Sequence, residues 1–232
     1  MTRAPGRRDV PKPSSAGKRS PATCQPPDGP AALDQYRRRA AVYDSELTAF
    51  EPVRRQAVAA LRLRPGDTVL DVGCGTGLSL PLLRAGIGPG GHIVGIEPCP
   101  EMIEQARRRA VRDQPGAIEL VCAPARTAGI AQPADAALFH FTHDVLRDEQ
   151  ALAHIARHLK PGARVVAAGL QWAPAWLAPV NAFVWLAALY SVTSLEGLER
   201  PWSRLAQHLE GLQVRSVPPG AIYIASGTFR GP

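Results

Sequence analysis

The chain has 232 residues, with 27 Lys and Arg against 20 Asp and Glu, which gives a formal net charge of +7. Residues 1–30 carry six basic and two acidic side chains, so this short segment supplies +4 of the total. The rest of the chain is nearly balanced, which argues against the focused basic face of a duplex-binding domain, and no nucleic-acid partner is expected. A length of this order suits one α/β domain with a substantial core.

The cysteines and the N-terminus bear on metal binding and location. No CxxC pair occurs, and no histidine stands at zinc-ligand spacing from a cysteine, so no metal site is expected. No apolar segment follows the N-terminal arginines, as a secretory signal would require. A cytoplasmic location is therefore expected.

The first 30 residues differ in composition from the remainder. They contain seven prolines together with Gly, Ser and scattered Arg, and very little that could repay the entropy of ordering them. The sequence predicts a disordered Pro/Arg-rich tail at 1–30 and a single domain at 31–232. Helical periodicity within 31–64 predicts N-terminal helices at the start of that domain.

Strand-like and helix-like segments alternate after residue 66. Strands are predicted at 68–72, 92–97, 118–122, 136–141 and 164–169, and helices at 78–85, 100–112 and 147–158. This alternation predicts a parallel sheet with helices on both faces, joined by right-handed crossovers. Two final strands, 212–217 and 221–228, flank a Pro-Pro-Gly turn and predict an antiparallel hairpin. The predicted fold class is therefore α/β, with a mostly parallel sheet of seven strands.

A glycine-rich loop follows the first predicted strand. Residues 71–77 read Asp-Val-Gly-Cys-Gly-Thr-Gly, so glycines at alternate positions open the next helix. The dinucleotide fingerprint GxGxxG would need a glycine at position 78, which is Leu78 here. This spacing disfavours a nicotinamide-dependent oxidoreductase.

Glu97 ends the second predicted strand, twenty residues after Gly77. Ligands of open α/β sheets bind beyond the carboxyl ends of the strands. A carboxylate at that position can accept hydrogen bonds from both hydroxyls of a ribose. The sequence therefore predicts a nucleoside site across the first two strands.

Glycine loop and spaced acid together resemble those of the class I S-adenosylmethionine-dependent methyltransferases. The resemblance covers about residues 43–170 and extends through the His-Leu-Lys-Pro-Gly segment at 158–162. The loop continuation at 76–81 is similar to stretches in bacterial quinone and phospholipid methyltransferases, of the type 11 methyltransferase kind. The resemblance implies a Rossmann-like seven-stranded fold and S-adenosyl-L-methionine as the cofactor.

The resemblance also implies roles for individual residues. Asp71 would support the loop and the methionine end of the cofactor, and Glu97 would bind the ribose. Many relatives place an Asp near position 124 to meet the adenine amino group, whereas this chain has Pro124. Adenine recognition would then depend on backbone groups and apolar packing. The expected cofactor-binding residues are Asp71, Gly73, Gly75, Gly77, Glu97, Pro98, Met102, Ala123 and Ala125.

Candidate acid–base residues follow the fourth predicted strand. The sulfonium makes the methyl group electrophilic, so the protein must mainly align an acceptor and exclude water. His143 is the first candidate for a general base, because imidazole titrates near neutrality. Its alternative role is a hydrogen-bonded residue that caps the next helix with Asp144. His140 is expected to pack within or beside the strand and is a candidate substrate contact.

Residues 165–195 contain no Asp, Glu, Lys or Arg. Prolines and an asparagine interrupt this segment after its first strand, so it does not predict a membrane span. It predicts instead a buried helix or an aromatic lid within 171–210, with Trp172, Trp176 and Tyr190 as candidate substrate contacts. Such a lid would favour a lipophilic acceptor or transient contact with a bilayer.

The function predicted from the sequence is methyl transfer from S-adenosyl-L-methionine to a small or lipophilic acceptor, of the quinone, lipid or secondary-metabolite class. A noncatalytic protein that binds the same cofactor is the main alternative, because methyl transfer needs few obligatory side chains. An aminopropyltransferase of similar fold would need an acidic groove, which residues 165–195 do not offer. Fold and cofactor do not determine the acceptor.

Overall fold

The structure is a computed structural model that describes residues 47–112, 118–191 and 195–231. The predicted tail at 1–30 and the first part of the predicted N-terminal helices, 31–46, lie outside the described residues. The described chain begins with a short 3-10 helix, η1 (Leu47–Phe50), which leads into helix α3 (Glu51–Ala60).

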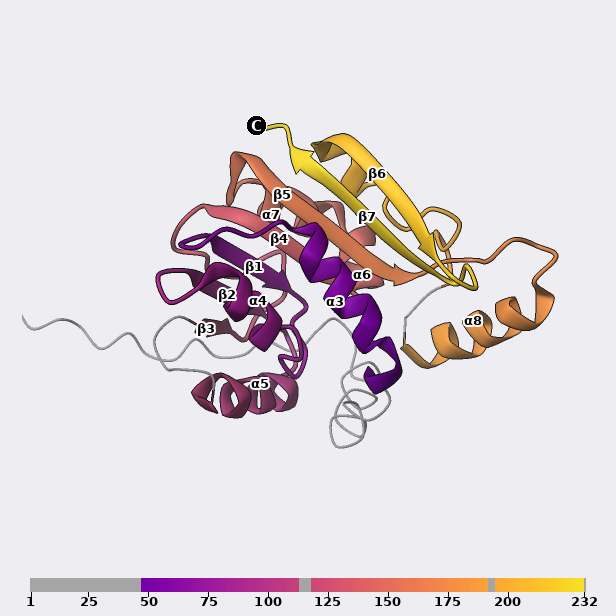
Figure 1. The fold of residues 1–232 in the computed structure, drawn as a ribbon, viewed down its shortest axis with the longest axis horizontal. Coiled ribbons are helices and arrows are strands. Elements are labelled where there is room, and N and C mark those ends of the chain that lie inside the picture. Colours follow the sequence, from indigo (N-terminus) through magenta and orange to yellow (C-terminus); the bar gives the residue numbers. More distant parts are fainter. Residues whose placement is uncertain (1–46, 113–117, 192–194, 232) are drawn as a thin grey trace, which may run out of the picture.

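The core of the fold is one seven-stranded sheet with the strand order β3-β2-β1-β4-β5-β7-β6 (Figure 1). The first five strands pair in parallel, and β7 runs antiparallel to both β5 and β6. This arrangement confirms the predicted α/β fold class with its C-terminal antiparallel hairpin. The strands are β1 (Thr68–Val72), β2 (His92–Ile96), β3 (Ile118–Val121), β4 (Ala134–His140), β5 (Leu159–Leu170), β6 (Leu209–Val217) and β7 (Ile222–Phe229).

Helices cover both faces of the sheet, because successive side chains of each buried strand point to opposite faces. Val69 and Leu138 pack on one face with the apolar sides of α3, α4 (Leu80–Ile87) and α5 (Pro100–Arg112). Leu70 and Phe139 pack on the other face with α6 (His143–Arg147), α7 (Glu149–Ala156) and η2 (Leu205–His208). The central strands β1 and β4 therefore bury apolar side chains on both faces of the sheet.

The strand order reverses at β1, which pairs with β2 on one side and with β4 on the other. Val72, the last residue of β1, is in register with Ile96 of β2 and with Phe139 of β4. Three parallel strands consequently end at the same level. This is the switch point at which open α/β sheets bind ligands.

The helix expected at 147–158 is α7, and the short helix α6 precedes it in the structure. Asp148, whose backbone is extended (φ −90°, ψ 102°), separates the two. The Asp148 side chain accepts hydrogen bonds from the backbone N–H groups of Gln150 (2.9 Å) and Ala151 (3.0 Å). Asp148 is thus the N-cap of α7, which satisfies two N–H groups that the helix itself leaves unpaired.

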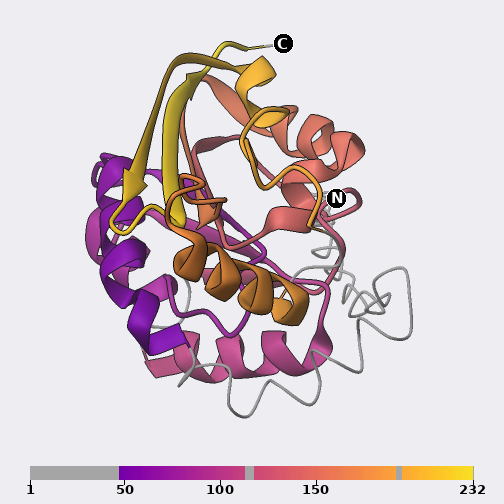
Figure 2. The ribbon, with the colours of Figure 1, turned by 90° about the vertical axis from the view of Figure 1, so that its right-hand side faces the viewer.

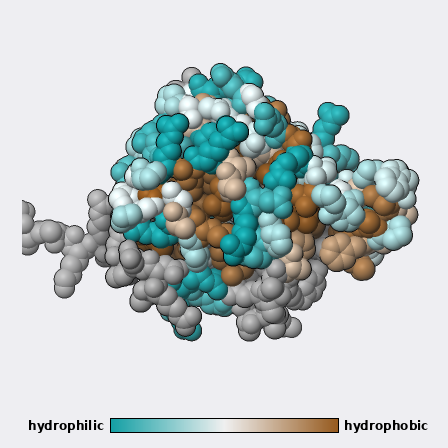
Figure 3. Space-filling model, viewed as in Figure 1, coloured by the Kyte–Doolittle hydropathy of each residue, from teal (hydrophilic) through white to brown (hydrophobic). Residues whose placement is uncertain are grey.

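Helix α8 (Ala178–Ser191) lies at one end of the molecule, beyond the carboxyl end of β5 (Figures 1 and 2). It is held by Val184, which packs with Leu170 and Leu198 in a small separate cluster. The exposed large apolar side chains on and before the helix are Trp176, Phe183, Trp185 and Leu186. Figure 3 shows brown, hydrophobic side chains at the surface of this end of the molecule. Within the described ranges, the helices are all too short or too polar to cross a membrane.

We predict that Asp148→Ala lowers the free energy of unfolding by about 1 kcal/mol, the usual cost of removing an N-cap side chain. Urea unfolding of the purified protein measures this change. Glu149→Ala is the matched control, because the Glu149 side chain is exposed and caps nothing in the structure. Equal stabilities of the two variants would contradict the capping role.

Candidate active site

The glycine loop after β1 is shaped by close approaches that a side chain would block. Gly73 (φ +72°) has no room for a Cβ, which would lie 2.3 Å from Cγ2 of Thr142, beyond the end of β4. A Cβ on Gly77 (φ +80°) would lie 2.6 Å from Cδ1 of Leu80 and 3.2 Å from the Cα atom of Ala106 in α5. Glycine is therefore required at both positions by conformation and by space.

Glu97 joins the loop after β1 to the loop after β2. Its carboxylate is buried and accepts hydrogen bonds from the backbone N–H groups of Gly75 (3.1 Å, to Oε2) and Cys99 (2.9 Å, to Oε1). Burial raises the pKa of Glu97 to about 7, although both N–H groups act in the opposite direction. A carboxylate has acceptor capacity beyond these two bonds. Glu97 can therefore hold the two loops and still accept from a ligand hydroxyl.

Asp71 is a second buried carboxyl in the same region. It lies one residue before the end of β1, and its Oδ2 atom has no hydrogen-bond partner. Burial raises the pKa of Asp71 to about 7, while nearby Arg54 lowers it and Glu97 raises it further. A buried acceptor without a partner is costly unless a ligand supplies the donor.

A cavity opens beside Asp71 at the ends of β1 and β4. It brings together four predicted site residues, namely Asp71, Gly73, Gly75 and His140, which are far apart in the sequence. The other lining residues come from the glycine loop, from the residue after β4 and from helix α3. The complete lining is Arg54, Asp71, Gly73, Cys74, Gly75, Thr76, Leu78, Ser79, His140 and Phe141.

The remaining predicted cofactor residues are not among those that line this cavity. Gly77 ends the loop, and Met102 is buried in the first turn of α5. Pro98 is half-buried after Glu97. Ala123 and Ala125 pack on the face of the sheet that carries Val72 and Ile96. Within the described residues, no cluster of His, Cys, Asp or Glu could hold a metal ion.

The two candidate histidines have different surroundings. His140 ends β4 and lines the cavity, and its Nε2 atom is buried without a partner. Burial and nearby Arg54 lower the pKa of His140 to about 3, so its imidazole is neutral at physiological pH. His143 is the first residue of α6 and is not among the cavity-lining residues; its Nε2 atom lies 3.0 Å from the carbonyl oxygen of Glu196. Burial lowers the pKa of His143 as well, and its Nδ1 atom has no partner.

The predicted aromatic contacts are not part of this cavity. Trp172 is partly buried and packs beside Leu170 and Val184, whereas Trp176 is 79% exposed. The side chain of Tyr190 lies outside the described residues, although its backbone belongs to α8. Their roles as substrate contacts stay predictions.

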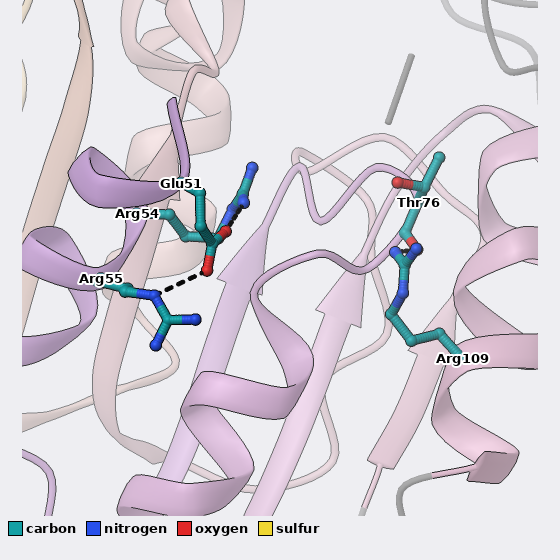
Figure 4. Close-up of polar contacts among 5 residues, drawn as sticks. All are labelled: Glu51, Arg54, Arg55, Thr76 and Arg109. Carbon is teal, nitrogen blue, oxygen red and sulfur yellow. Dashed lines mark hydrogen bonds and ion pairs between the residues drawn. The ribbon is translucent and has the colours of Figure 1, made fainter. Parts of the chain in front are cut away.

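Two arginines that the sequence analysis did not single out hold the site from either side (Figure 4). Arg54 extends from α3 beside Glu51 and lines the cavity. Arg109 extends from α5 and donates to the Thr76 carbonyl at 2.7 Å, which supports the glycine loop. A signal for Arg54 existed, because it shares the helical stripe of Val58 and Leu61 and therefore faces the core.

Sheet order, glycine loop and the acid at the end of β2 together define the class I fold of S-adenosylmethionine-dependent methyltransferases. Residues 69–162 match the family model of methyltransferase domains. The matched segment contains the glycine loop and Glu97, the two features on which the predicted resemblance to these methyltransferases rests.

Several known proteins are similar to this chain. Aklanonic acid methyltransferase DauC from Streptomyces sp. (strain C5) is 34% identical over 118 residues, which are 50% of this chain and 54% of that protein. Demethylmenaquinone methyltransferase from Symbiobacterium thermophilum is 42% identical over 60 residues, 26% of this chain and 24% of that protein. The N-methyltransferase NodS from Bradyrhizobium japonicum, solved with S-adenosyl-l-homocysteine, superposes with a TM-score of 0.64 at 17% identity, over 85% of this chain and 97% of that one.

The sequence matches are local. The chain spans about half the length or less of the curated relatives that it matches. The NodS comparison extends the likeness to most of the chain at the level of the fold.

We predict that the affinity for S-adenosylhomocysteine falls as the pH is lowered through 7. Burial raises the pKa values of Asp71 and Glu97 to about 7, and the expected contacts with a ligand ammonium and a ribose diol require the charged carboxylates. Each carboxyl must then lose its proton on binding, which weakens affinity by up to roughly tenfold per pH unit below the pKa. Calorimetry between pH 5.5 and 8 measures the slope.

Glu97→Ala should remove part of this pH dependence and weaken binding at pH 8. Glu104→Ala is the control, because Glu104 is exposed on α5 and only pairs with neighbouring arginines. An affinity that stays constant from pH 5.5 to 8 in the wild-type protein would contradict the assignment of the two carboxyls.

Proposed function

We propose that the protein transfers a methyl group from S-adenosyl-L-methionine to a small, lipophilic acceptor of the quinone, lipid or secondary-metabolite class. The observation that carries this proposal is the cavity at the ends of β1 and β4, where the glycine loop and the unpartnered Asp71 carboxyl meet His140 and Phe141. The side of the cavity formed by the glycine loop and Asp71 suits a charged nucleoside. The side formed by His140 and Phe141 borders the space for an acceptor.

The residues present fit this cofactor. Oδ2 of Asp71 offers an acceptor without a partner, and Glu97 retains acceptor capacity at the end of the next strand. We assign Asp71, Gly73, Gly75, Gly77 and Glu97 to the cofactor on this basis. Pro98, Met102, Ala123 and Ala125 are assigned to the adenine side. The cofactor, when bound, supplies a methyl group that is already electrophilic, so the protein needs to orient the acceptor and exclude water.

Phe141 supports a lipophilic acceptor, because it connects the cavity to the apolar end of the molecule. It lines the cavity, packs on Phe50 with ring centroids 5.0 Å apart, and contacts the cluster that holds α8. Its backbone is in the left-handed region (φ +57°), which is rare for an aromatic residue and is typical of functional sites. An acceptor beyond Phe141 would meet apolar side chains.

The exposed apolar residues around α8 extend this surface. Trp176, Phe183, Trp185 and Leu186 give the helix an apolar surface that a lipophilic compound or a bilayer interface could contact. Similarity to methyltransferases named for aklanonic acid and demethylmenaquinone also supports this acceptor class. The lid at 171–210 and the transient membrane contact stay predictions.

The direct test is transfer of labelled methyl groups from S-adenosylmethionine to fractionated quinones, lipids and polar metabolites. We expect label in a lipophilic fraction, and label confined to polar metabolites would contradict the acceptor class. Cofactor binding without transfer to any fraction would instead support the noncatalytic alternative. Glu104→Ala, which leaves the cavity unchanged, serves as the positive control.

His143 is the proposed general base, through Nδ1. A neutral imidazole that donates Nε2–H to the Glu196 carbonyl has its lone pair on Nδ1. His140 is the proposed acceptor contact, since a pKa of about 3 makes it a weak base.

We predict that His143→Ala lowers kcat roughly 100-fold or more, as expected for a lost general base, with little change in cofactor affinity. His143→Gln separates this role from a structural one, because its amide can still donate to the Glu196 carbonyl but cannot accept a proton from the acceptor. Steady-state kinetics should show the Gln variant as slow as the Ala variant. Recovery of turnover with Gln would assign His143 to holding the Glu196 segment.

A further inference from the structure

Residues 195–198 form a short strap that contacts helix α6. The last residue of this strap, Leu198, is fully buried and packs with Leu170 and Val184. Its carbonyl oxygen accepts a hydrogen bond from the backbone N–H of Trp172 at 3.0 Å. Because Leu170 ends β5, the strap is anchored to the carboxyl end of the sheet.

Two side chains of α6 hold Glu196, the second residue of the strap. Nε2 of His143 lies 3.0 Å from the Glu196 carbonyl oxygen, and the guanidinium of Arg147 pairs with the Glu196 carboxylate. His143 and Arg147 are four residues apart on one helix, so they lie on the same side of it. Glu196 is therefore held through its main chain and through its side chain.

Gly197 sets the direction of the Glu196 carbonyl, because that carbonyl belongs to the peptide group between the two residues. The Gly197 backbone is in the left-handed region (φ +82°), which L-residues rarely adopt. A Cβ at this position would lie 4.0 Å from Nε of Arg147, which is ordinary contact distance. Glycine is thus favoured here by conformation and not by lack of space.

The Glu196 carbonyl determines which nitrogen of His143 carries the hydrogen. A carbonyl oxygen can only accept, so Nε2 must be the donor and the lone pair of the neutral ring lies on Nδ1. Nδ1 is buried without a partner. Burial and, to a smaller extent, Arg147 lower the pKa of His143, whereas the Glu196 carbonyl and Asp144 act in the opposite direction. The bond to the carbonyl therefore makes Nδ1 a better proton acceptor.

We propose that Arg147 and Gly197 are positioning residues for His143, which hold the Glu196 carbonyl where it accepts Nε2–H and keeps the lone pair on Nδ1. This inference rests on the proposed function for the reaction that it serves. In the transfer, the acceptor's proton passes to Nδ1, the acceptor atom bonds to the methyl carbon, and the electron pair of the broken carbon–sulfur bond stays on sulfur. Nδ1 then releases the proton to water.

Arg204 provides a matched control for Arg147. It pairs with Glu149 at 2.7 Å, and both ion pairs join a partly exposed arginine to a glutamate that is more than three-quarters exposed. The pair of Arg204 connects the residue before η2 to α7, whereas the pair of Arg147 holds the strap. A general effect of losing an exposed ion pair should therefore be equal in Arg147→Gln and Arg204→Gln.

Nitrogen-15 NMR of the histidine rings tests the positioning without any reaction. The chain has six histidines, so the His143 signals are assigned by their loss in His143→Gln. At pH 8, where the ring is neutral, we expect the wild-type full-length protein to show His143 with its hydrogen on Nε2. Arg147→Gln should show a mixture of the two tautomers, and Arg204→Gln should keep the wild-type signals.

Steady-state kinetics at pH 8 tests the consequence for turnover. Arg147→Gln should lower kcat roughly two- to fivefold, the range for an exposed ion pair, with KM and cofactor affinity unchanged. In a His143→Ala background the same substitution should have no further effect, because the group that it positions is gone. Arg204→Gln should leave kcat unchanged in both backgrounds.

Two substitutions of Gly197 separate conformation from side-chain size. Asn adopts the left-handed region far more readily than the β-branched Val does. Gly197→Asn should therefore keep most of the wild-type turnover, and Gly197→Val should lose at least as much as Arg147→Gln. If Gly197→Val does not fold, Arg147→Gln still decides the matter, since it removes only an exposed ion pair.

Three results would overturn the proposal. They are a wild-type His143 with its hydrogen on Nδ1, equal kcat values for Arg147→Gln and Arg204→Gln, and an equal loss from Arg147→Gln with and without the His143 imidazole. The last result would assign Arg147 a structural role only. Absence of methyl transfer by the wild-type protein would reject the proposed function, and the tautomer comparison would still confirm or overturn the positioning.

Discussion

The site depends on two hydrogen bonds from backbone N–H groups to the carboxylate of Glu97. Gly75 and Cys99 belong to different loops, and Glu97 holds both at the ends of neighbouring parallel strands. The sheet alone would place β1 and β2 side by side but would not set the conformation of the loops beyond them. Because the carboxylate is buried, its bonds are little screened by water, and both loops keep one arrangement. A nucleoside would meet a site that is formed before it binds.

The same site keeps several polar groups in an unfavourable state. Asp71 and Arg54 are buried with an oxygen and a nitrogen that have no partner, and burial raises the pKa of Asp71 to about 7. Such groups cost folding free energy in the free protein. A ligand that supplied hydrogen-bond partners to these atoms would remove that cost, and the gain would add to its affinity.

Sequence reasoning was most reliable where one physical signal decided the outcome. Alternating buried strands and helices fixed the sheet, and the glycine spacing located the loop, because no other residue type fits beside Thr142 or Ala106. It was less reliable where the outcome depended on contacts between residues that are far apart in the sequence. The predicted helix at 147–158 agrees with α7 to within two residues at each end, whereas the short helix α6 before it was not predicted. Arg54 was not singled out, and the two bonds of Glu97 depend on loop conformations that no residue spacing encodes. The identity of the acceptor could not be predicted from the sequence, because the surfaces that would contact it, such as α8, carry no recognisable motif.

The most direct measurement is a crystal structure of the protein with S-adenosylhomocysteine bound. We predict that the ribose hydroxyls bind the Glu97 carboxylate, that the homocysteine end lies beside Asp71, and that the sulfur faces His140 and Phe141. A nucleoside bound elsewhere on the sheet, or a ribose that makes no contact with Glu97, would contradict it.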